Sequence, residues 1–168
     1  MAIHNQLKFF RQHLIKGESM RLLAEPEYSV IWDEFYRKYN FNPSIENFPS
    51  ISEPRQSITF GLALTHNDAM IHELTKCITG GLKCSTFGNE EFYYLDWQHQ
   101  CYAGDVLELR RGYYPDGDYA IAMNKNLDFG TFGHPWERSI CIIGEELVLH
   151  VIQNKPRIFN CILRNNFA

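Results

Sequence analysis

Three short segments hold most of the side chains whose types could do chemistry. They are residues 95–102, 115–119 and 130–137, and each contains acidic or histidine side chains beside aromatic rings. A histidine titrates near neutral pH, and a neighbouring carboxylate fixes which ring nitrogen carries the proton. If the three segments meet at one edge of a sheet, their acids and imidazoles could perform general acid–base catalysis. The candidate catalytic residues are Asp96, His99, Asp118, His134 and Glu137.

The same segments are rich in tryptophan and tyrosine, which favours a different use. These side chains bury a large area, keep one polar group, and concentrate at the centres of protein interfaces. No spacing among the polar residues specifies a reaction. The alternative interpretation is therefore a binding surface, in which polar groups hold the loops and present the rings. Its candidate residues are Trp97, His99, Tyr102, Asp118, Tyr119, His134, Trp136 and Glu137.

The cysteines and histidines do not follow a known metal-binding motif. His99 and Cys101, with Cys77 and Cys84 upstream, supply suitable donors. However, the chain has no Cys-x-x-Cys pair and no His-Glu-x-x-His segment, and free cysteine is often simply buried. It also lacks a Gly-x-Ser-x-Gly nucleophile motif and a glycine-rich phosphate loop. The sequence therefore predicts no metal and no cofactor.

Composition and charge limit the class of protein. The net charge is −4 and the Lys and Arg residues form no basic cluster, so binding to nucleic acid or to an anionic membrane is not expected. No apolar run approaches the length of about 18 residues that spans a bilayer. Five cysteines at irregular spacing, without a signal peptide, are typical of reduced thiols in a cytoplasmic protein. Nothing in the composition indicates the oligomeric state.

The periodicity of apolar residues predicts an α+β fold, with N-terminal helices followed by a mostly antiparallel β-sheet. Residues 1–25 are expected to form a helical segment, and residues 26–168 a single domain. Further helices are expected at 27–39 and from 67 or 68 to 78, where Gly80-Gly81 would end the second. Residues 144–152 could form a short helix or another strand. The expected strands are 56–64, 92–97, 106–110, 118–123, 127–132, 139–143 and 158–163, with a hairpin turn at 124–126.

Residues 95–99, 117–119 and 130–137 resemble a bacterial family catalogued as domain of unknown function 2716. The resemblance runs from about Tyr28 to near Phe159, and residues 141–145 also follow the pattern of similar sequences. Residues 101–111 depart from it, because this stretch is shorter and less rich in proline than expected.

Small acidic cytoplasmic domains of this kind are often immunity proteins, which neutralise a cognate toxin delivered by neighbouring cells. The family name itself carries no activity. The absence of a catalytic motif and the compact acidic composition favour a non-catalytic protein-binding function, with a cognate toxin as the partner. Two alternatives stay open. One is a small hydrolase or transferase that uses His and carboxylate residues, and the other is an enzyme that reverses a toxin's modification of its target.

Overall fold

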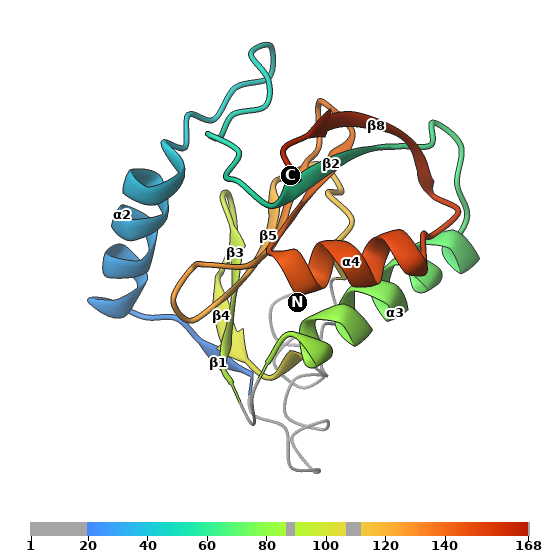
Figure 1. Cartoon of the computed structure of the whole chain (residues 1–168). Helices are drawn as coiled ribbons and strands as arrows, with labels where there is room; N and C mark the ends of the chain where they lie inside the picture. Colours follow the sequence, from blue (N-terminus) through green and yellow to red (C-terminus); the bar gives the residue numbers. More distant parts are fainter. Residues whose placement is uncertain (1–19, 87–89, 107–111, 168) are drawn as a thin grey trace, which may run out of the picture.

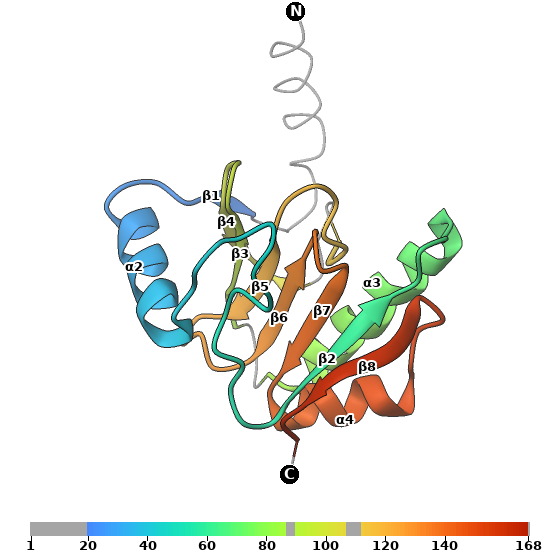
Figure 2. The same ribbon diagram turned by 90° about the horizontal axis from the view of Figure 1, so that it is seen from above.

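A single antiparallel sheet forms the centre of the molecule, and helices cover both of its faces (Figure 1). The computed structural model describes residues 20–86, 90–106 and 112–167. Within these residues the sheet has eight strands in the order β1-β4-β3-β5-β6-β7-β2-β8. Helix α2 lies on one face, and α3 and α4 lie side by side on the other (Figures 1 and 2). The predicted α+β fold with an antiparallel sheet is confirmed.

The bounds of the elements follow the chain. The helices are α2 (Glu27–Tyr39), α3 (Asp68–Cys84) and α4 (Glu145–Gln153). The strands are β1 (Arg21–Leu22), β2 (Ser57–Leu62), β3 (Phe92–Asp96), β4 (Tyr102–Gly104), β5 (Ala120–Asn124), β6 (Gly130–His134), β7 (Ser139–Ile143) and β8 (Phe159–Asn165). None of the helices in the described ranges is both long and apolar enough to cross a membrane.

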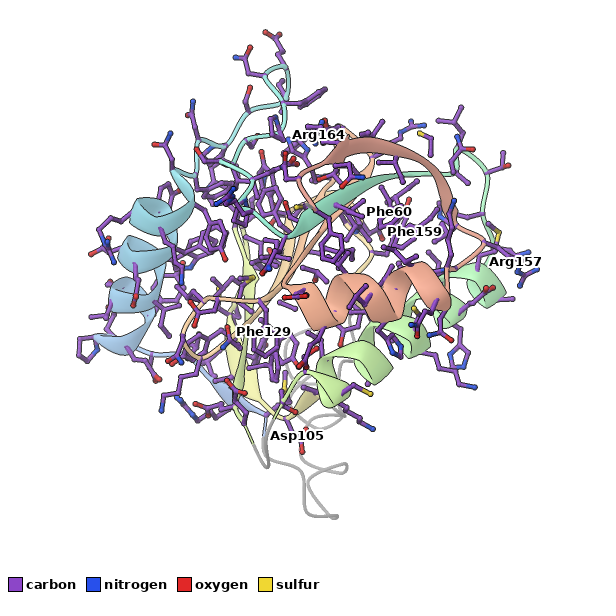
Figure 3. All side chains as sticks on the ribbon, in the orientation of Figure 1. Phe60, Asp105, Phe129, Arg157, Phe159 and Arg164 are labelled. Carbon is purple, nitrogen blue, oxygen red and sulfur yellow. The ribbon has the colours of Figure 1, made fainter. Side chains whose placement is uncertain are left out.

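The central strands are buried over almost their whole length because both of their faces are covered. Successive side chains of a strand point to opposite faces of the sheet. In β3, Tyr93 and Leu95 therefore join the core beneath α2, whereas Phe92 and Tyr94 join the core beneath α3 and α4. On the latter side Phe60 of β2 stacks on Phe159 of β8, with ring centroids 4.4 Å apart (Figure 3).

Helix α2 has the bounds that the sequence predicts. Its buried side chains, Ile31, Trp32, Phe35 and Tyr39, lie on one stripe and pack on the sheet. The helix ends at Asn40, which adopts a left-handed conformation with φ 49°. Asparagine tolerates that conformation better than most residues do.

Helix α3 is longer than predicted, because Gly80 and Gly81 do not end it. Its N-cap is Asn67, whose side chain accepts a hydrogen bond from the backbone N–H of Met70 at 3.0 Å. A Cβ atom on Gly81 would lie 2.6 Å from Cδ1 of Leu147 in α4. The glycine pair therefore lets α3 and α4 approach closely. The prediction that Gly80-Gly81 ends the helix is wrong, because glycine is common both at helix ends and where helices pack closely.

Three further predictions are wrong or lie partly outside the described residues. Residues 145–153 form α4, so the helices are not all N-terminal. The strand before β5 is β4 at Tyr102–Gly104, whereas residues 107–111 of the strand predicted at 106–110 lie outside the described residues. Of the helical segment predicted at 1–25, residues 1–19 also lie outside them. Arg21–Leu22 form strand β1, which pairs with β4. Strands β5 and β6 do form the predicted hairpin, but its connection covers residues 125–129, so the strand predicted at 127–132 begins at Gly130.

Candidate functional site

The three polar and aromatic segments lie at one end of neighbouring strands. Asp96 ends β3, Asp118 and Tyr119 precede β5, and His134 ends β6. The register places Asp96 beside Ala120, and Ala120 beside Gly133. However, the five predicted acids and imidazoles form two groups instead of one cluster, with the ring of Tyr119 between them.

The first group consists of Asp96, His99 and Asp118. Nδ1 of His99 lies 2.8 Å from Oδ1 of Asp96 and 3.6 Å from Oδ2 of Asp118. The backbone N–H of Gln98 donates to Oδ2 of Asp118 at 2.7 Å, and the N–H of Tyr119 donates to Oδ1 at 2.8 Å. These backbone donors hold the Asp118 carboxylate in place, so the group is positioned by the ends of two strands.

The two carboxyl groups of this site titrate as a pair. Burial and the contact with Asp96 raise the pKa of Asp118 to about 6. Burial also acts to raise the pKa of Asp96, but hydrogen bonds from Asp118 and His99 outweigh it and lower that pKa. Two adjacent carboxylates cannot both ionise easily, so one proton is shared between them in mildly acidic solution.

A cavity of about 380 Å³ lies beside this group. Asp96, His99 and Asp118 all line it. Its other walls include three tyrosines. Burial raises the pKa of each, so their phenols hold their protons more firmly than a free tyrosine does. These are Tyr94, Tyr113 and Tyr114. Tyr102 also lines the cavity, and its hydroxyl donates to Oε1 of Gln100 at 3.0 Å.

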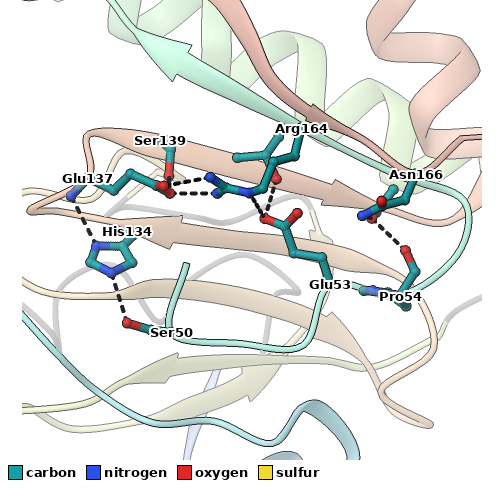
Figure 4. Close-up of polar contacts among 10 residues, drawn as sticks. Ser50, Glu53, Pro54, His134, Glu137, Ser139, Arg164 and Asn166 are labelled. Carbon is teal, nitrogen blue, oxygen red and sulfur yellow. Dashed lines mark hydrogen bonds and ion pairs between the residues drawn. The ribbon is translucent and has the colours of Figure 1, made fainter. Parts of the chain in front are cut away.

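The second group is built around His134, which is fully buried. Its Nδ1 accepts a hydrogen bond from the backbone N–H of Glu137 at 3.2 Å, and its Nε2 lies 2.9 Å from Oγ of Ser50 (Figure 4). Because Nδ1 is an acceptor, the proton of the neutral ring sits on Nε2 and is donated to Ser50. His134 in this tautomer cannot take a proton from Ser50, so the pair does not form a nucleophile and its general base.

The side chain of Glu137 faces away from His134 and joins a buried ionic network. Both of its oxygens accept hydrogen bonds from the Arg164 guanidinium at 2.7 Å. Nε of Arg164 donates to Oε1 of Glu53 at 2.9 Å (Figure 4). Burial acts to raise the pKa of Glu137, but the hydrogen bonds from Arg164 and Ser139 lower it below its usual value. This network connects β8 to the loop before β2 and to the turn after β6.

Sequence reasoning missed Ser50, Glu53 and Arg164. Glu53 and Arg164 are 111 positions apart in the chain, and no motif connects them. The sequence shows a charged residue, Arg164, near the end of a predicted strand. A lone charge in a strand does not identify the residue with which it pairs.

Trp97 and Trp136 lie on either side of Tyr119 and are partly open to solvent. Their exposed fractions are 40% and 37%, and their ring centroids lie 6.0 and 5.4 Å from that of buried Tyr119. Nε1 of Trp97 donates to the hydroxyl of Tyr36 at 3.2 Å. The ring of Phe48 contacts the ring of His134 edge to face, with ring centroids 4.8 Å apart. The exposed rings of Tyr36, Phe48, Trp97 and Trp136, joined through Tyr119 and His134, form one connected surface, called the aromatic surface below.

The cysteines considered as metal donors do not converge in the described structure. Cys77 is buried in α3 and Cys84 is exposed at its end. Cys101 is buried, and its Sγ donates to the backbone oxygen of Asp96 at 3.3 Å. Burial raises the pKa of the Cys101 thiol, which makes it a poor nucleophile.

Comparison with known proteins places the chain in a family. A model described as protein of unknown function (DUF2716) matches residues 22–148, which is more than half of the 168 residues. The chain belongs to the DUF2716 family. The resemblance seen in the sequence is thus confirmed, although the match begins and ends earlier than expected. The uncharacterized protein YxiI of Bacillus subtilis (strain 168) is 27% identical over 154 residues, covering 82% of this chain and 94% of that protein. No solved structure matches the chain.

The DUF2716 match contains both groups of polar residues except for one side chain. Arg164 lies in β8, beyond residue 148 where the match ends. In this member of the DUF2716 family, the buried acids Glu53 and Glu137 of the matched region therefore depend on a strand outside it.

Burial of His134 gives this DUF2716 protein a specific dependence of stability on pH. Burial lowers the pKa of His134 to about 4, whereas an unfolded histidine titrates near 6.5. As pH falls from about 6.5 to 4, the unfolded chain takes up a proton that the folded chain does not, so stability falls. We expect His134→Gln to remove about 3 kcal/mol of this loss, measured by urea unfolding at pH 7 and pH 4.

The control for this prediction is His72→Gln, which changes an exposed histidine on α3. It should leave the pH dependence of unfolding as in the original protein. If the original protein and His134→Gln lost equal stability between pH 7 and pH 4, His134 would not remain neutral in the folded protein.

Proposed function

We propose that this protein binds another protein through its aromatic surface, and that it acts in the cytoplasm as an immunity protein that neutralises a cognate toxin. The observation that carries the proposal is the pair of half-exposed tryptophans on one buried tyrosine. Trp97 and Trp136 both contact the ring of Tyr119. Tryptophan and tyrosine supply much of the binding energy in protein interfaces, mostly near the centre of the buried patch.

The aromatic surface is held in place before any partner arrives. The hydroxyl of Tyr119 donates to the backbone oxygen of Ser44 at 3.2 Å and accepts from the N–H of Ser44 at 3.0 Å. Ser50 contacts the same hydroxyl at 3.1 Å and also contacts His134. These bonds tie the loop that carries Phe48 to the strand ends that carry the tryptophans. A rigid surface loses little conformational entropy on binding, which favours affinity.

Exposed acidic residues lie near the ring-bearing residues in the chain, although exposed Arg37 and Arg138 lie near them too. Asp33 lies one helical turn before Tyr36 on α2, and Glu46 is exposed in the loop that carries Phe48. Asp116 lies in the wall of the adjacent cavity, of which Tyr119 is also a part. Negative groups around an aromatic centre attract a positively charged protein surface and exclude acidic ones. Proteins that act on nucleic acids carry such a basic surface, because they neutralise phosphates, so a toxin of that kind would suit this site.

Acid–base catalysis has less support from the geometry. His134 has the wrong tautomer to activate Ser50, as described above. The residues known to line the cavity include no Ser, Thr or Cys, and Tyr94, Tyr113 and Tyr114 hold their protons firmly. The Asp96–His99 pair has the geometry of a general base, since a carboxylate at 2.8 Å orients the imidazole. The hydrolase and transferase alternatives therefore stay predictions that rest on this pair.

The test is whether the protein protects cells that express a candidate toxin gene taken from the neighbourhood of its own gene. We expect the original protein to protect and to bind the purified toxin domain in a calorimetric titration. Trp97→Ala and Trp136→Ala should each weaken binding by at least about 2 kcal/mol, or roughly thirtyfold. The double variant that carries both substitutions should no longer protect cells. Their thermal unfolding should change little because both side chains are partly exposed.

Leu64→Ala is the matched control, since Leu64 is an apolar side chain outside the aromatic surface that is more exposed than either tryptophan. It should bind and protect as the original protein does. A folded Trp97→Ala/Trp136→Ala double variant that still protects cells would contradict the proposed surface. Protection that is instead lost in His99→Gln, without loss of binding, would indicate catalysis.

A further inference from the structure

The cavity beside the aromatic surface has three potential metal ligands converging on its wall. Asp96, His99 and Asp118 each offer one donor atom, and the three atoms lie within 4.8 Å of one another. They come from the end of β3, the following loop and the entry to β5. Neighbouring ligands of an octahedral ion with bonds of about 2.1 Å lie about 3 Å apart. The spacings of 2.8 and 3.6 Å from His99 Nδ1 to the two carboxylates match this geometry.

The surroundings orient these donors before an ion binds. The N–H of Gln98 donates to Oδ2 of Asp118 at 2.7 Å, and also approaches Oδ1 of Asp96 at 3.3 Å. Such bonds from the backbone to a ligating carboxylate fix its direction and are typical of the shell around protein metal sites. Asp118 is almost completely buried, so its carboxylate has little freedom to turn away from the other two donors.

The cavity leaves room for the remaining ligands. All three donors line a space of about 380 Å³, which is much larger than an ion and could hold water or a small molecule. A structural zinc site is closed by four protein ligands, whereas three protein ligands beside an open space are typical of a site that binds a further ligand.

We propose that Asp96, His99 and Asp118 bind one divalent first-row transition-metal ion of the Mn²⁺ class, with its open coordination positions facing the cavity. One imidazole and two carboxylates suit such an ion, whereas Ca²⁺ and Mg²⁺ prefer oxygen donors alone. This inference is independent of the proposed binding function, because the aromatic surface does not require the ion.

The experiment is a titration of the chelator-treated full chain with Mn²⁺, followed by electron paramagnetic resonance and calorimetry. Mn²⁺ prefers oxygen and nitrogen donors to thiolates, so the exposed Cys84 and Cys161 compete little. We expect one saturable site per chain. His99→Gln and Asp118→Asn should each weaken Mn²⁺ binding by at least about tenfold.

Asp116→Asn is the matched control, because Asp116 lines the same cavity without belonging to the three donors. It should leave the affinity for Mn²⁺ unchanged. His99→Gln is the decisive variant, since the His99 side chain is 57% exposed and its loss does not threaten the fold. The proposal would be overturned if Mn²⁺ did not saturate, if His99→Gln bound it as well as the original protein, or if Asp116→Asn weakened binding equally through general charge.

Discussion

Arg164→Met is expected to lower the free energy of unfolding by about 3–5 kcal/mol. The substitution keeps much of the side-chain volume and removes only the charge and its hydrogen bonds. It would leave the Glu53 and Glu137 carboxylates, which are 5% and 9% exposed, without their cation. An unpaired buried carboxylate is far more costly than the absence of an ion pair. Urea unfolding at pH 7, followed by circular dichroism, measures the difference.

Arg157→Met provides the comparison, because Arg157 also pairs with a glutamate but at the surface (Figure 3). That exposed pair with Glu73 should contribute little to stability, because water and salt screen it, so Arg157→Met should unfold nearly as the original protein does. A second comparison combines Arg164→Met with Glu53→Gln and Glu137→Gln. This triple variant should be more stable than Arg164→Met alone, since no buried charge is left unpaired. Similar losses for Arg157→Met and Arg164→Met would mean that burial of the network has no energetic consequence.

Gly130→Ala is expected to cost about 4 kcal/mol or more, or to prevent folding. Gly130 opens β6 opposite Met123 and has a φ of 149°. A Cβ atom there would lie 2.0 Å from the backbone oxygen of Ala122. The backbone of β5 cannot move away without losing its pairing with β3 as well. The yield of folded protein and its thermal unfolding temperature report the effect.

Gly117→Ala separates the effect of backbone conformation from that of the steric clash. Gly117 also has a positive φ, at 74°, but a Cβ atom there would meet nothing within 4 Å. The expected cost is about 1 kcal/mol, which is the usual penalty for a left-handed residue with a side chain. If both variants lost the same stability, the close approach of β5 to Gly130 would not matter.

The elements with clear local patterns were predictable from the sequence. The bounds of α2 follow from its apolar stripe, and β7 follows from a short apolar run between turn residues. Elements that depend on distant partners were not predictable. Gly80 and Gly81 stop many helices, and only the presence of α4 beside them shows that here they allow packing. β1 has two residues and exists because β4 pairs with it.

The candidate site was predictable in its location but not in its internal arrangement. Residues at the ends of β3, β5 and β6 lie together because these strands are neighbours, and the hairpin turn between β5 and β6 indicated part of that order. The direction of each side chain was not visible in the sequence. Glu137 follows His134 closely, yet its carboxylate binds Arg164 and only its backbone N–H reaches the imidazole.

The position of β2 in the sheet has a consequence for how the chain folds during synthesis. β2 is made early, but it pairs only with β7 and β8: Ser57 lies opposite Ile143, and Ile58 opposite Asn165. Contacts between residues so distant in sequence form slowly, because a long loop must close first. While the ribosome makes the intervening residues, the apolar β2 segment has no strand to pair with and is open to aggregation. Strand β8 thus completes the edge of the sheet that β2 began about a hundred residues earlier in synthesis.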